Sequence, residues 1–231
     1  MKYGEIIELG RHKLMCGDAT SRDDVMRLVD GQKVDLVLTD PPYGIRILGN
    51  SSRGTLGLGG RKYPEVIGDN GTAMFKEHYH IARILCNNMI IWGGQNFTEF
   101  LPASCGWLFW DKDKGTDKLS FSDGELAWAN ILTRIKKYKY KWNGNNIGGN
   151  PELNTRVHVT QKPVELHMRI LEDFSKPDDV ILDCFGGSGT TLIACEMTGR
   201  KCLMMEISSE YCGIIAERYR KLREVMPLAV V

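Results

Sequence analysis

Short runs of hydrophobic residues, each bounded by turn-forming residues, recur through the first half of the chain. Runs of this length and setting are typical of β-strands, and they cover Val34–Leu38, Met89–Trp92, Trp107–Trp110 and Leu126–Ile131. Between them, apolar residues recur at helical spacing over Asp23–Val29 and Ala73–Leu85. Strands that alternate with helices indicate a βαβ arrangement, and the helical pattern is the weaker of the two here.

The second half of the chain alternates more clearly. Helices are predicted at Pro163–Phe174, Thr190–Met197 and Glu210–Val225, and strands at Val180–Leu182 and Cys202–Met205. This order, α-β-α-β-α, is typical of a doubly wound α/β fold with a mostly parallel sheet. We therefore predict a single domain over residues 1–231.

Two segments fit neither pattern. Residues 46–71 are rich in glycine, serine and basic residues, and we predict a flexible loop there. Residues 112–154 combine one apolar strand with a basic and aromatic stretch and an Asn/Gly-rich end, which predicts a small insertion in the domain. The spacings of His78, His80 and His167 place them on helix surfaces, and we assign them no role.

The overall composition excludes several classes of protein. The 30 basic and 29 acidic residues nearly cancel, so any surface that binds nucleic acid must be local. Seven cysteines, without a CxxC pair or a matched Cys/His spacing, predict reduced thiols and no metal site. The N-terminus is polar, and no apolar run approaches the roughly 18 residues of a membrane span. We expect a soluble, cytoplasmic protein without a membrane partner.

A glycine-rich turn follows the predicted strand at Val180–Leu182 and reads DCFGGSGTT. Such a turn lets a ligand approach the backbone, and the free N–H groups of the following helix favour an electron-rich group. A phosphate-binding loop would need a lysine after its last glycine, and a dinucleotide fingerprint would need glycine where Leu192 stands. These departures favour a nucleoside without a pyrophosphate. Glu206, at the end of the next strand, is placed to accept both hydroxyls of a ribose.

The strand at Val34–Leu38 leads into Asp40-Pro-Pro-Tyr43. Proline lacks an N–H and restricts the residue before it, so this segment fixes a carboxylate and unpaired carbonyls in rigid backbone. Two such acceptors suit the two N–H donors of a planar exocyclic amine and would aim its lone pair at an electrophile. Tyr43 offers a face for base stacking. A base in a duplex reaches such a pocket only when it is flipped out.

With these motifs the chain resembles the S-adenosylmethionine (SAM)-dependent amino-methyltransferases of DNA. In their permuted β class, DPPY precedes the FxGxG cofactor motif, as Asp40–Tyr43 precedes Phe185–Gly189 here. The resemblance covers nearly the whole chain and implies a circularly permuted, Rossmann-like class I methyltransferase fold. Ile90–Asn96 resembles a segment that lines the base pocket.

The resemblance implies a set of site residues. The catalytic motif corresponds to Asp40, Pro41, Pro42 and Tyr43. Cys16–Ala19 matches the segment whose acid contacts the cofactor's adenine, His158–Pro163 the segment that closes over its methionine end, and Glu206 the ribose-binding acid. The expected cofactor contacts are Asp18, Lys162, Pro163, Asp183, Phe185, Gly186, Gly187, Ser188, Gly189, Thr190 and Glu206.

The implied reaction is a single in-line methyl transfer from SAM, without metal or covalent intermediate. Because the amine becomes acidic only after alkylation, Asp40 is not expected to be a true general base. Cys184 lies outside a nucleophile motif, which argues against cytosine-C5 chemistry. DPPY favours adenine N6. The alternatives are cytosine N4, an RNA or nucleotide amine, and a non-catalytic DNA-binding homologue; a dehydrogenase is disfavoured by Leu192.

Double-stranded DNA is the expected partner. Basic residues alternate with aromatic ones over Arg134–Trp142, and phosphate contacts are predicted for Arg134, Lys136, Lys137, Lys139 and Lys141. This makes residues 112–154 a candidate DNA-recognition insertion. Arg53, Arg61 and Lys62 are further candidates in the loop over residues 46–71. A bacterial, archaeal or phage enzyme is expected, with or without a cognate restriction endonuclease, and a homodimer would share the reading of DNA.

Overall fold

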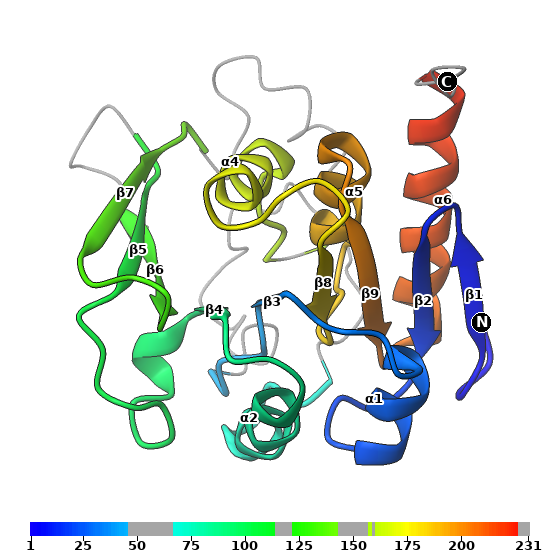
Figure 1. Ribbon diagram of the computed structural model, residues 1–231, viewed down its shortest axis with the longest axis horizontal. Coiled ribbons are helices and arrows are strands. Elements are labelled where there is room, and N and C mark those ends of the chain that lie inside the picture. Colours follow the sequence, from blue (N-terminus) through cyan, green and yellow to red (C-terminus); the bar gives the residue numbers. More distant parts are fainter. Residues whose placement is uncertain (46–66, 114–121, 143–156, 159, 226–231) are drawn as a thin grey trace, which may run out of the picture.

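The computed structural model describes residues 1–45, 67–113, 122–142, 157–158 and 160–225 (Figure 1). Within them, strands form one sheet in the order β1-β2-β9-β8-β3-β4-β6-β5-β7. Their bounds are β1 Ile6–Leu9, β2 His12–Cys16, β3 Leu36–Thr39, β4 Met89–Trp92, β5 Trp107–Asp111, β6 Gly124–Ala129, β7 Ile135–Lys139, β8 Val180–Asp183 and β9 Lys201–Glu206. Neighbours from β2 to β4 in this order pair in parallel, which confirms the predicted mostly parallel sheet.

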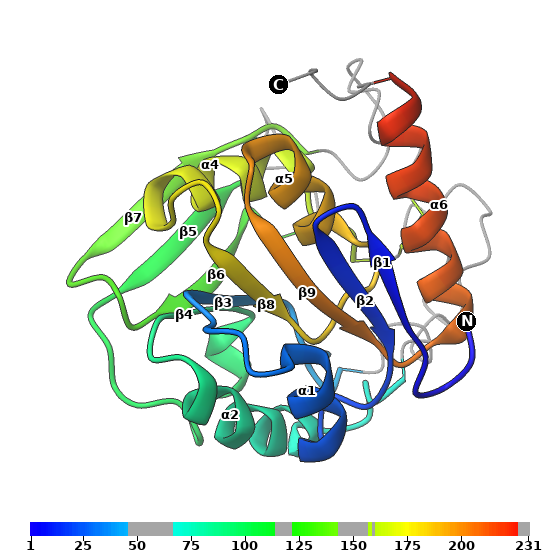
Figure 2. The same cartoon turned by 45° about the vertical axis from the view of Figure 1, so that its right-hand side comes forward.

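Helices cover both faces of the sheet, as a doubly wound fold requires. One face carries α1 (Arg22–Val29) and α2 (Ala73–Leu85), and the other carries α4 (Val164–Phe174), α5 (Thr190–Thr198) and α6 (Ser209–Val225) (Figures 1 and 2). A turn of 3-10 helix, η1 (Gly94–Asn96), follows β4. The helices predicted from the sequence therefore form with bounds within one or two residues of those expected.

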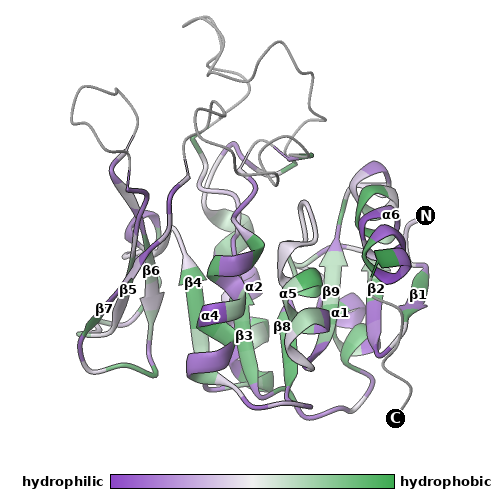
Figure 3. Cartoon of the chain, turned by 90° about the horizontal axis from the view of Figure 1, so that it is seen from above, coloured by the Kyte–Doolittle hydropathy of each residue, from purple (hydrophilic) through white to green (hydrophobic). Residues whose placement is uncertain are grey.

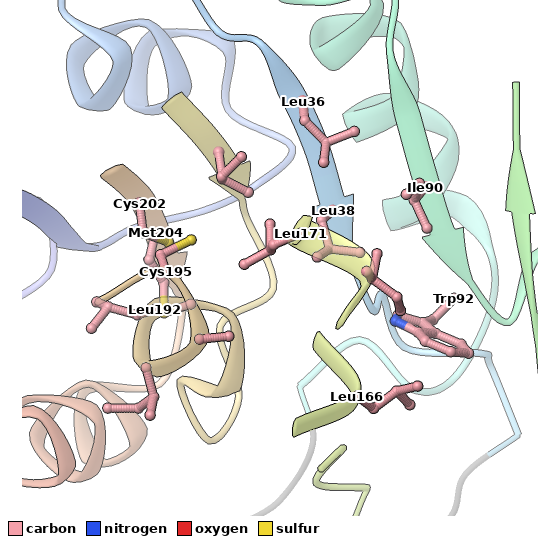
Figure 4. Packing of buried hydrophobic residues seen from close by; sticks show 14 of the residues in the cluster. Leu36, Leu38, Ile90, Trp92, Leu166, Leu171, Leu192, Cys195, Cys202 and Met204 are labelled. Carbon is pink, nitrogen blue, oxygen red and sulfur yellow. The ribbon is translucent and has the colours of Figure 1, made fainter. Parts of the chain in front are cut away.

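Two hydrophobic clusters, one on each side of the sheet, make up the core. Leu36 and Leu38 of β3 belong to the cluster that includes residues of α4, α5 and α6, whereas Val37 belongs to the cluster that includes residues of α1 and α2. Successive side chains of a strand point to opposite faces, so a strand covered on both sides needs a continuous apolar run. Figure 4 shows residues of the first cluster, including Trp92 of β4 and Leu171 of α4. The same pattern that predicted the strands thus builds both halves of the core.

Three strands were not predicted from the sequence. In β1 and β2 charged or polar residues stand beside short apolar stretches, and three of the five residues of β7 are lysines. His12 opens β2 yet is buried, because Cys202 donates its N–H to Nδ1 (2.9 Å) and Nε2 lies 2.7 Å from Glu196 Oε2. A satisfied polar residue can occupy a core position that a hydrophobicity pattern reads as a loop.

Figure 3 shows that hydrophobic residues, drawn in green, are concentrated along the central strands, including β3, β4 and β9. Such runs are only a few residues long and belong to the sheet. Among the helices of the described residues, none combines the length and the apolar character that crossing a membrane requires. In the same residues, no three His, Cys, Asp or Glu side chains are grouped so that they could hold a metal ion.

Two histidines predicted to lie on helix surfaces are buried instead, which corrects that expectation. The side chain of His78 is on the α2 face toward the sheet, 1% exposed, with Nδ1 3.2 Å from the carbonyl of Ala19. His167 is 3% exposed; its Nε2 accepts the indole N–H of Trp92 (3.2 Å), which requires a neutral ring. Burial lowers the pKa of His78 to about 4 and that of His167 to about 3.

We expect His78 to make the fold sensitive to acid. In the unfolded chain its imidazole takes up a proton near pH 6.5, whereas the folded protein resists protonation until about pH 4. The unfolded state therefore binds more protons in this window, and stability falls as the pH falls. Relative to His78→Gln, the wild-type free energy of unfolding should drop by about 1.4 kcal/mol per pH unit below 6.5. Urea unfolding of both proteins at pH 7, 6 and 5 measures this difference.

The matched variant is needed because other buried groups titrate in the same range. Burial raises the pKa of Asp183 to about 7, so this carboxyl favours the folded state as the pH falls and opposes the histidines. Its contribution cancels between wild type and His78→Gln. A difference that stays constant from pH 7 to pH 5 would contradict the assignment to His78.

Candidate active site

A cleft opens at the carboxyl ends of the parallel strands. Residues that follow three neighbouring strands line it: the Asp40 segment after β3, Phe185 after β8, and Glu206 at the end of β9. The carboxyl ends of adjacent parallel strands meet at one edge of a sheet, so the fold brings together motifs that are far apart in sequence. The lining also includes Gly17, Ala19, Pro41, Pro42, Tyr43, Ile45, Ile67, Asp69, Met74, His158, Thr160, Cys184, Gly187, Ile207 and Tyr211.

Asp40 and Tyr43 are joined by a hydrogen bond in this cleft. The Tyr43 hydroxyl donates to Asp40 Oδ1 (2.6 Å), and the ammonium of Lys162 donates to Oδ2 (2.6 Å). Burial raises the pKa of Asp40, and attraction to Lys162 opposes this shift. Burial, together with the neighbouring Asp40, raises the pKa of Tyr43 well above its usual value, so the phenol stays protonated. An ionised carboxylate has about four acceptor sites, which leaves room for the donors of a ligand.

The position of the Tyr43 ring depends on a close approach of the backbone at Gly93. This residue follows β4 with a φ of +67°, and a Cβ atom built on it would lie 2.1 Å from Tyr43 Cε1. Only glycine combines that conformation with that contact. Gly93 belongs to Ile90–Asn96, the segment predicted to line the base pocket, and it forms the surface on which the Tyr43 ring rests.

The glycine turn and Glu206 are bound to each other. Glu206 Oε2 accepts the backbone N–H of Gly187 (2.7 Å), and Oε1 accepts that of Ser208 (2.8 Å). Burial raises the pKa of this carboxyl, and the backbone hydrogen bonds oppose the shift. Gly187 and Gly189 have φ values of +51° and +80°, in the region that favours glycine. The turn therefore presents its backbone and an acid to the same part of the cleft.

Other residues predicted to contact the cofactor do not line the cleft. They are Asp18, Lys162, Pro163, Asp183, Gly186, Ser188, Gly189 and Thr190. Several of them hold the lining segments in place. Asp183 Oδ1 accepts hydrogen bonds from the Thr39 hydroxyl (2.7 Å) and the Phe185 N–H (3.1 Å). The Thr190 hydroxyl donates to the carbonyl of Lys162 (3.1 Å), which links the glycine turn to the start of α4.

The basic stretch predicted to contact DNA forms β7, at one end of the sheet order (Figure 1). Arg134 and Lys141 are exposed. Three lysines form ion pairs within the domain: Lys136 with Asp173, Lys137 with Asp111 and Lys139 with Asp113, at 2.6, 2.7 and 3.1 Å. These pairs reduce the positive charge that the sequence suggested for this strand. Arg53, Arg61 and Lys62 lie outside the described residues.

The aromatic residues of this stretch are placed differently from the sequence prediction. The aromatic residues interleaved with these lysines suggest flat faces for bases, but the Tyr138 and Trp142 side chains are only 6% exposed. The Tyr138 hydroxyl donates to Asp173 Oδ2, and the Trp142 ring lies edge-on to Trp110. The alternation along β7 therefore separates a core face from a solvent face, as in any half-buried strand.

Comparison with known proteins identifies the family. The sequence model of the family described as DNA methylase, of the N6/N4 methyltransferase type, matches residues 66–217. The chain belongs to this DNA methylase family. This match includes the glycine turn, Glu206 and Lys162, and begins after the Asp40 motif.

Named relatives of this DNA methylase are bacterial type II methyltransferases. M.HpaI of Haemophilus parainfluenzae is 26% identical over 237 residues, which are 89% of this chain and 73% of that protein. M2.MboI of Moraxella bovis is 26% identical over 236 residues, 88% of this chain and 86% of the relative. Each alignment covers so much of the chain that it spans both the Asp40 motif and the glycine turn.

Two solved structures share the fold of this DNA methylase. The M1.HpyAVI–SAM complex has a TM-score of 0.57 at 20% identity and covers 89% of this chain and 97% of its own. The PvuII DNA methyltransferase, named as cytosine-N4-specific, also has a TM-score of 0.57, at 15% identity, with 93% and 90% covered. At these identities the likeness establishes the architecture.

Sequence reasoning missed several residues that line the cleft of the DNA methylase. Asp69 Oδ1 accepts the backbone N–H of Ile45 (3.0 Å), and so joins the two described residues on either side of positions 46–66. Tyr211, in the first turn of α6, lies with its ring centroid 4.6 Å from that of His158. His158 belongs to a segment already singled out, whereas Asp69 and Tyr211 stand in no recognisable motif. Only tertiary structure brings them to the site.

Proposed function

We propose that this DNA methylase transfers a methyl group from SAM to the exocyclic N6 amine of an adenine flipped out of double-stranded DNA. One observation carries the proposal. The Asp40–Tyr43 segment, which we call the clamp, and the glycine turn that Glu206 binds at Gly187 line the same cleft. The first suits an amine acceptor and the second suits a nucleoside. Family membership supports DNA as the substrate class.

The charges of the cleft fit SAM. Its charged lining residues, among those described, are the acids Asp40, Asp69 and Glu206, without a lysine or an arginine. Such a lining favours a cationic sulfonium and disfavours a pyrophosphate. Gly187 and Glu206 would hold the adenosine part, with Phe185 and Tyr211 as apolar walls. SAM is also the ligand named for the M1.HpyAVI structure, which has the same fold.

When bound, SAM would supply a methyl group on a sulfonium: its transfer to the amine nitrogen would leave the electron pair of the broken C–S bond on sulfur, and the alkylated amine would release its proton to solvent. The chain's own residues orient the acceptor. Asp40 accepts an N–H of the amine and stabilises the positive charge that grows on its nitrogen. Pro41 and Pro42 keep the adjoining backbone rigid, and Tyr43 supplies a stacking face.

Adenine N6 is favoured over cytosine N4 by the DPPY form of the clamp. Both amines present two N–H donors on a planar ring, so the same residues would orient either one. The residues at β7 and the predicted contacts Arg53, Arg61 and Lys62 would bind phosphates around the flipped base. A motif order with the clamp before the glycine turn supports assignment to the permuted β class.

Nucleoside mass spectrometry tests the proposed function. Unmethylated double-stranded DNA is incubated with the purified protein and SAM carrying a deuterated methyl group, with an RNA substrate in parallel. We expect deuterated N6-methyladenine in the DNA. N4-methylcytosine would support the role of Asp40 and Tyr43 but make cytosine the target base. Label in RNA alone would make RNA the substrate. No label, with SAM binding retained, would identify a non-catalytic homologue.

A further inference from the structure

Lys162 lies on the acceptor side of the site, between two acids. Its ammonium is 2.6 Å from Asp40 Oδ2 and 3.0 Å from Glu125 Oε2, and the other oxygen of Glu125 is 2.7 Å from the ammonium of Lys112. The Lys162 side chain is only 4% exposed. Charges of alternating sign therefore run from the cleft through Lys162 and Glu125 to Lys112.

Sheet pairing determines this arrangement. Glu125 is on β6 opposite Trp110 of β5, and Lys112 comes just after that strand. β6 also pairs with β4, the neighbour of β3, which ends at the Asp40 segment. Lys162 immediately precedes Pro163 and α4, and its ammonium also lies 5.4 Å from the centre of the Trp92 ring. Each group thus stands on a strand or within two residues of a strand or helix end.

One acid would be enough to neutralise a buried lysine, and a second acid divides its charge. With Lys162 shared, Asp40 keeps one strong donor on each oxygen, Tyr43 on Oδ1 and Lys162 on Oδ2. Its remaining lone pairs stay available to an amine. Without Glu125, the ammonium would act on Asp40 alone and weaken it as an acceptor. Without Lys162, the buried carboxylate would favour its protonated form, which carries an O–H donor and is a weaker acceptor for the amine.

We propose that Lys162 and Glu125 are positioning residues for Asp40: Lys162 keeps the carboxylate charged and correctly rotated, and Glu125 limits how strongly Lys162 draws on it. This inference rests on the proposed function, in which Asp40 binds the amine. It moves Lys162 from the expected cofactor contacts to the acceptor side and gives Glu125, which stands in no recognised motif, a role in the reaction.

The titration behaviour of the group supports this arrangement. Burial disfavours the ammonium of Lys162, but its two carboxylate neighbours outweigh burial and raise its pKa. Burial would raise the pKa of Glu125, but Lys162 and Lys112 lower it to about 2. The other titratable groups that interact with these residues are Tyr43, Asp183 of β8 and His167 of α4. Lys162 and Glu125 therefore both remain charged at neutral pH.

Two substitutions should move the pKa of Asp40 in opposite directions. Lys162→Met removes the stabilising cation, so the acidic limb of the kcat profile moves to higher pH. Glu125→Gln removes a nearby negative charge and leaves the ammonium to Asp40, so the limb moves to lower pH. We expect each shift to be about one pH unit, a tenfold change in rate at a fixed pH on the limb. Lys162→Arg keeps the charge and should return the limb toward its wild-type position.

A purely structural ion pair would behave differently. It would lower activity and stability in both variants without shifting the limb in opposite directions, and that result would overturn the inference. Lys33→Met is the matched control, because Lys33 is also 2.6 Å from an acid, Asp35, in the segment that leads into β3, away from the cleft. Its pH profile should match that of the wild type.

A measurement without turnover separates this inference from the proposed function. Carbon NMR of protein labelled at aspartate carboxyls follows the titration of Asp40, whose signal is assigned by its loss in Asp40→Asn. The pKa should rise in Lys162→Met and fall in Glu125→Gln. If the two variants show these opposite shifts but the wild-type protein methylates no nucleic acid, the electrostatic arrangement is retained and the proposed function is rejected. If the pKa of Asp40 is the same in both variants as in the wild type, the inference alone is rejected.

Discussion

Replacing Asp40 with alanine is expected to reduce methyl transfer by about 10³-fold, the scale seen when a group that stabilises developing charge is removed. Asp40 is the acid that accepts the hydroxyl of Tyr43 and the ammonium of Lys162 at the end of β3. Without it, the amine loses both its orientation and the negative charge beside its nitrogen. Single-turnover transfer of a labelled methyl group measures the loss directly.

The affinity for SAM should change little in the same variant. Of the proposed adenosine contacts, Gly187 lies in the turn after β8 and Glu206 at the end of β9, and neither belongs to the Asp40 segment. Asp40→Asn is the closest matched substitution, since it keeps the shape and removes the charge, and it should lose nearly as much activity. Wild-type turnover in either variant would reject the clamp. A parallel loss of SAM binding would instead place Asp40 in the cofactor site.

The central part of the fold follows directly from the sequence. Leu36, Val37 and Leu38 are apolar in succession, as a strand covered on both faces requires, and the structure buries them in the two clusters. The motifs at Asp40 and Phe185 end such strands, so their approach to one cleft could be expected from parallel topology alone. Local patterns suffice where each residue is read against its immediate neighbours.

Other features depend on partners that are distant in sequence. The sequence pattern could not predict that His12 is a buried strand residue, because its burial depends on hydrogen bonds with Glu196 and the backbone of Cys202. Glu125 gave no signal, since a single acid in a short strand is typical of a solvent face, and its meaning comes from Lys162. A chemical role defined by an ion pair across the sheet has no spacing in the sequence that could reveal it.

Glu206→Gln is expected to weaken SAM binding by roughly 30- to 100-fold, which corresponds to the loss of about 2–3 kcal/mol for hydrogen bonds to a charged group. Each oxygen of Glu206 already accepts a backbone N–H, from Gly187 and from Ser208. A glutamine has one oxygen, so its NH₂ group would face one of these donors and displace the turn. Isothermal titration calorimetry with SAM measures the loss, and Glu210→Gln, an exposed position at the start of α6, is the matched control.

The kinetic form of the two losses distinguishes the two halves of the cleft. A defect in cofactor binding raises KM for SAM and is overcome by saturation, whereas a defect in the clamp lowers kcat at any concentration. Glu206→Gln should therefore recover most of its turnover at high SAM, and Asp40→Ala should not. If saturating SAM failed to restore the turnover of Glu206→Gln, Glu206 would also affect the chemical step. The displaced Gly187 turn would then hold the methyl group of bound SAM out of line with the amine at Asp40.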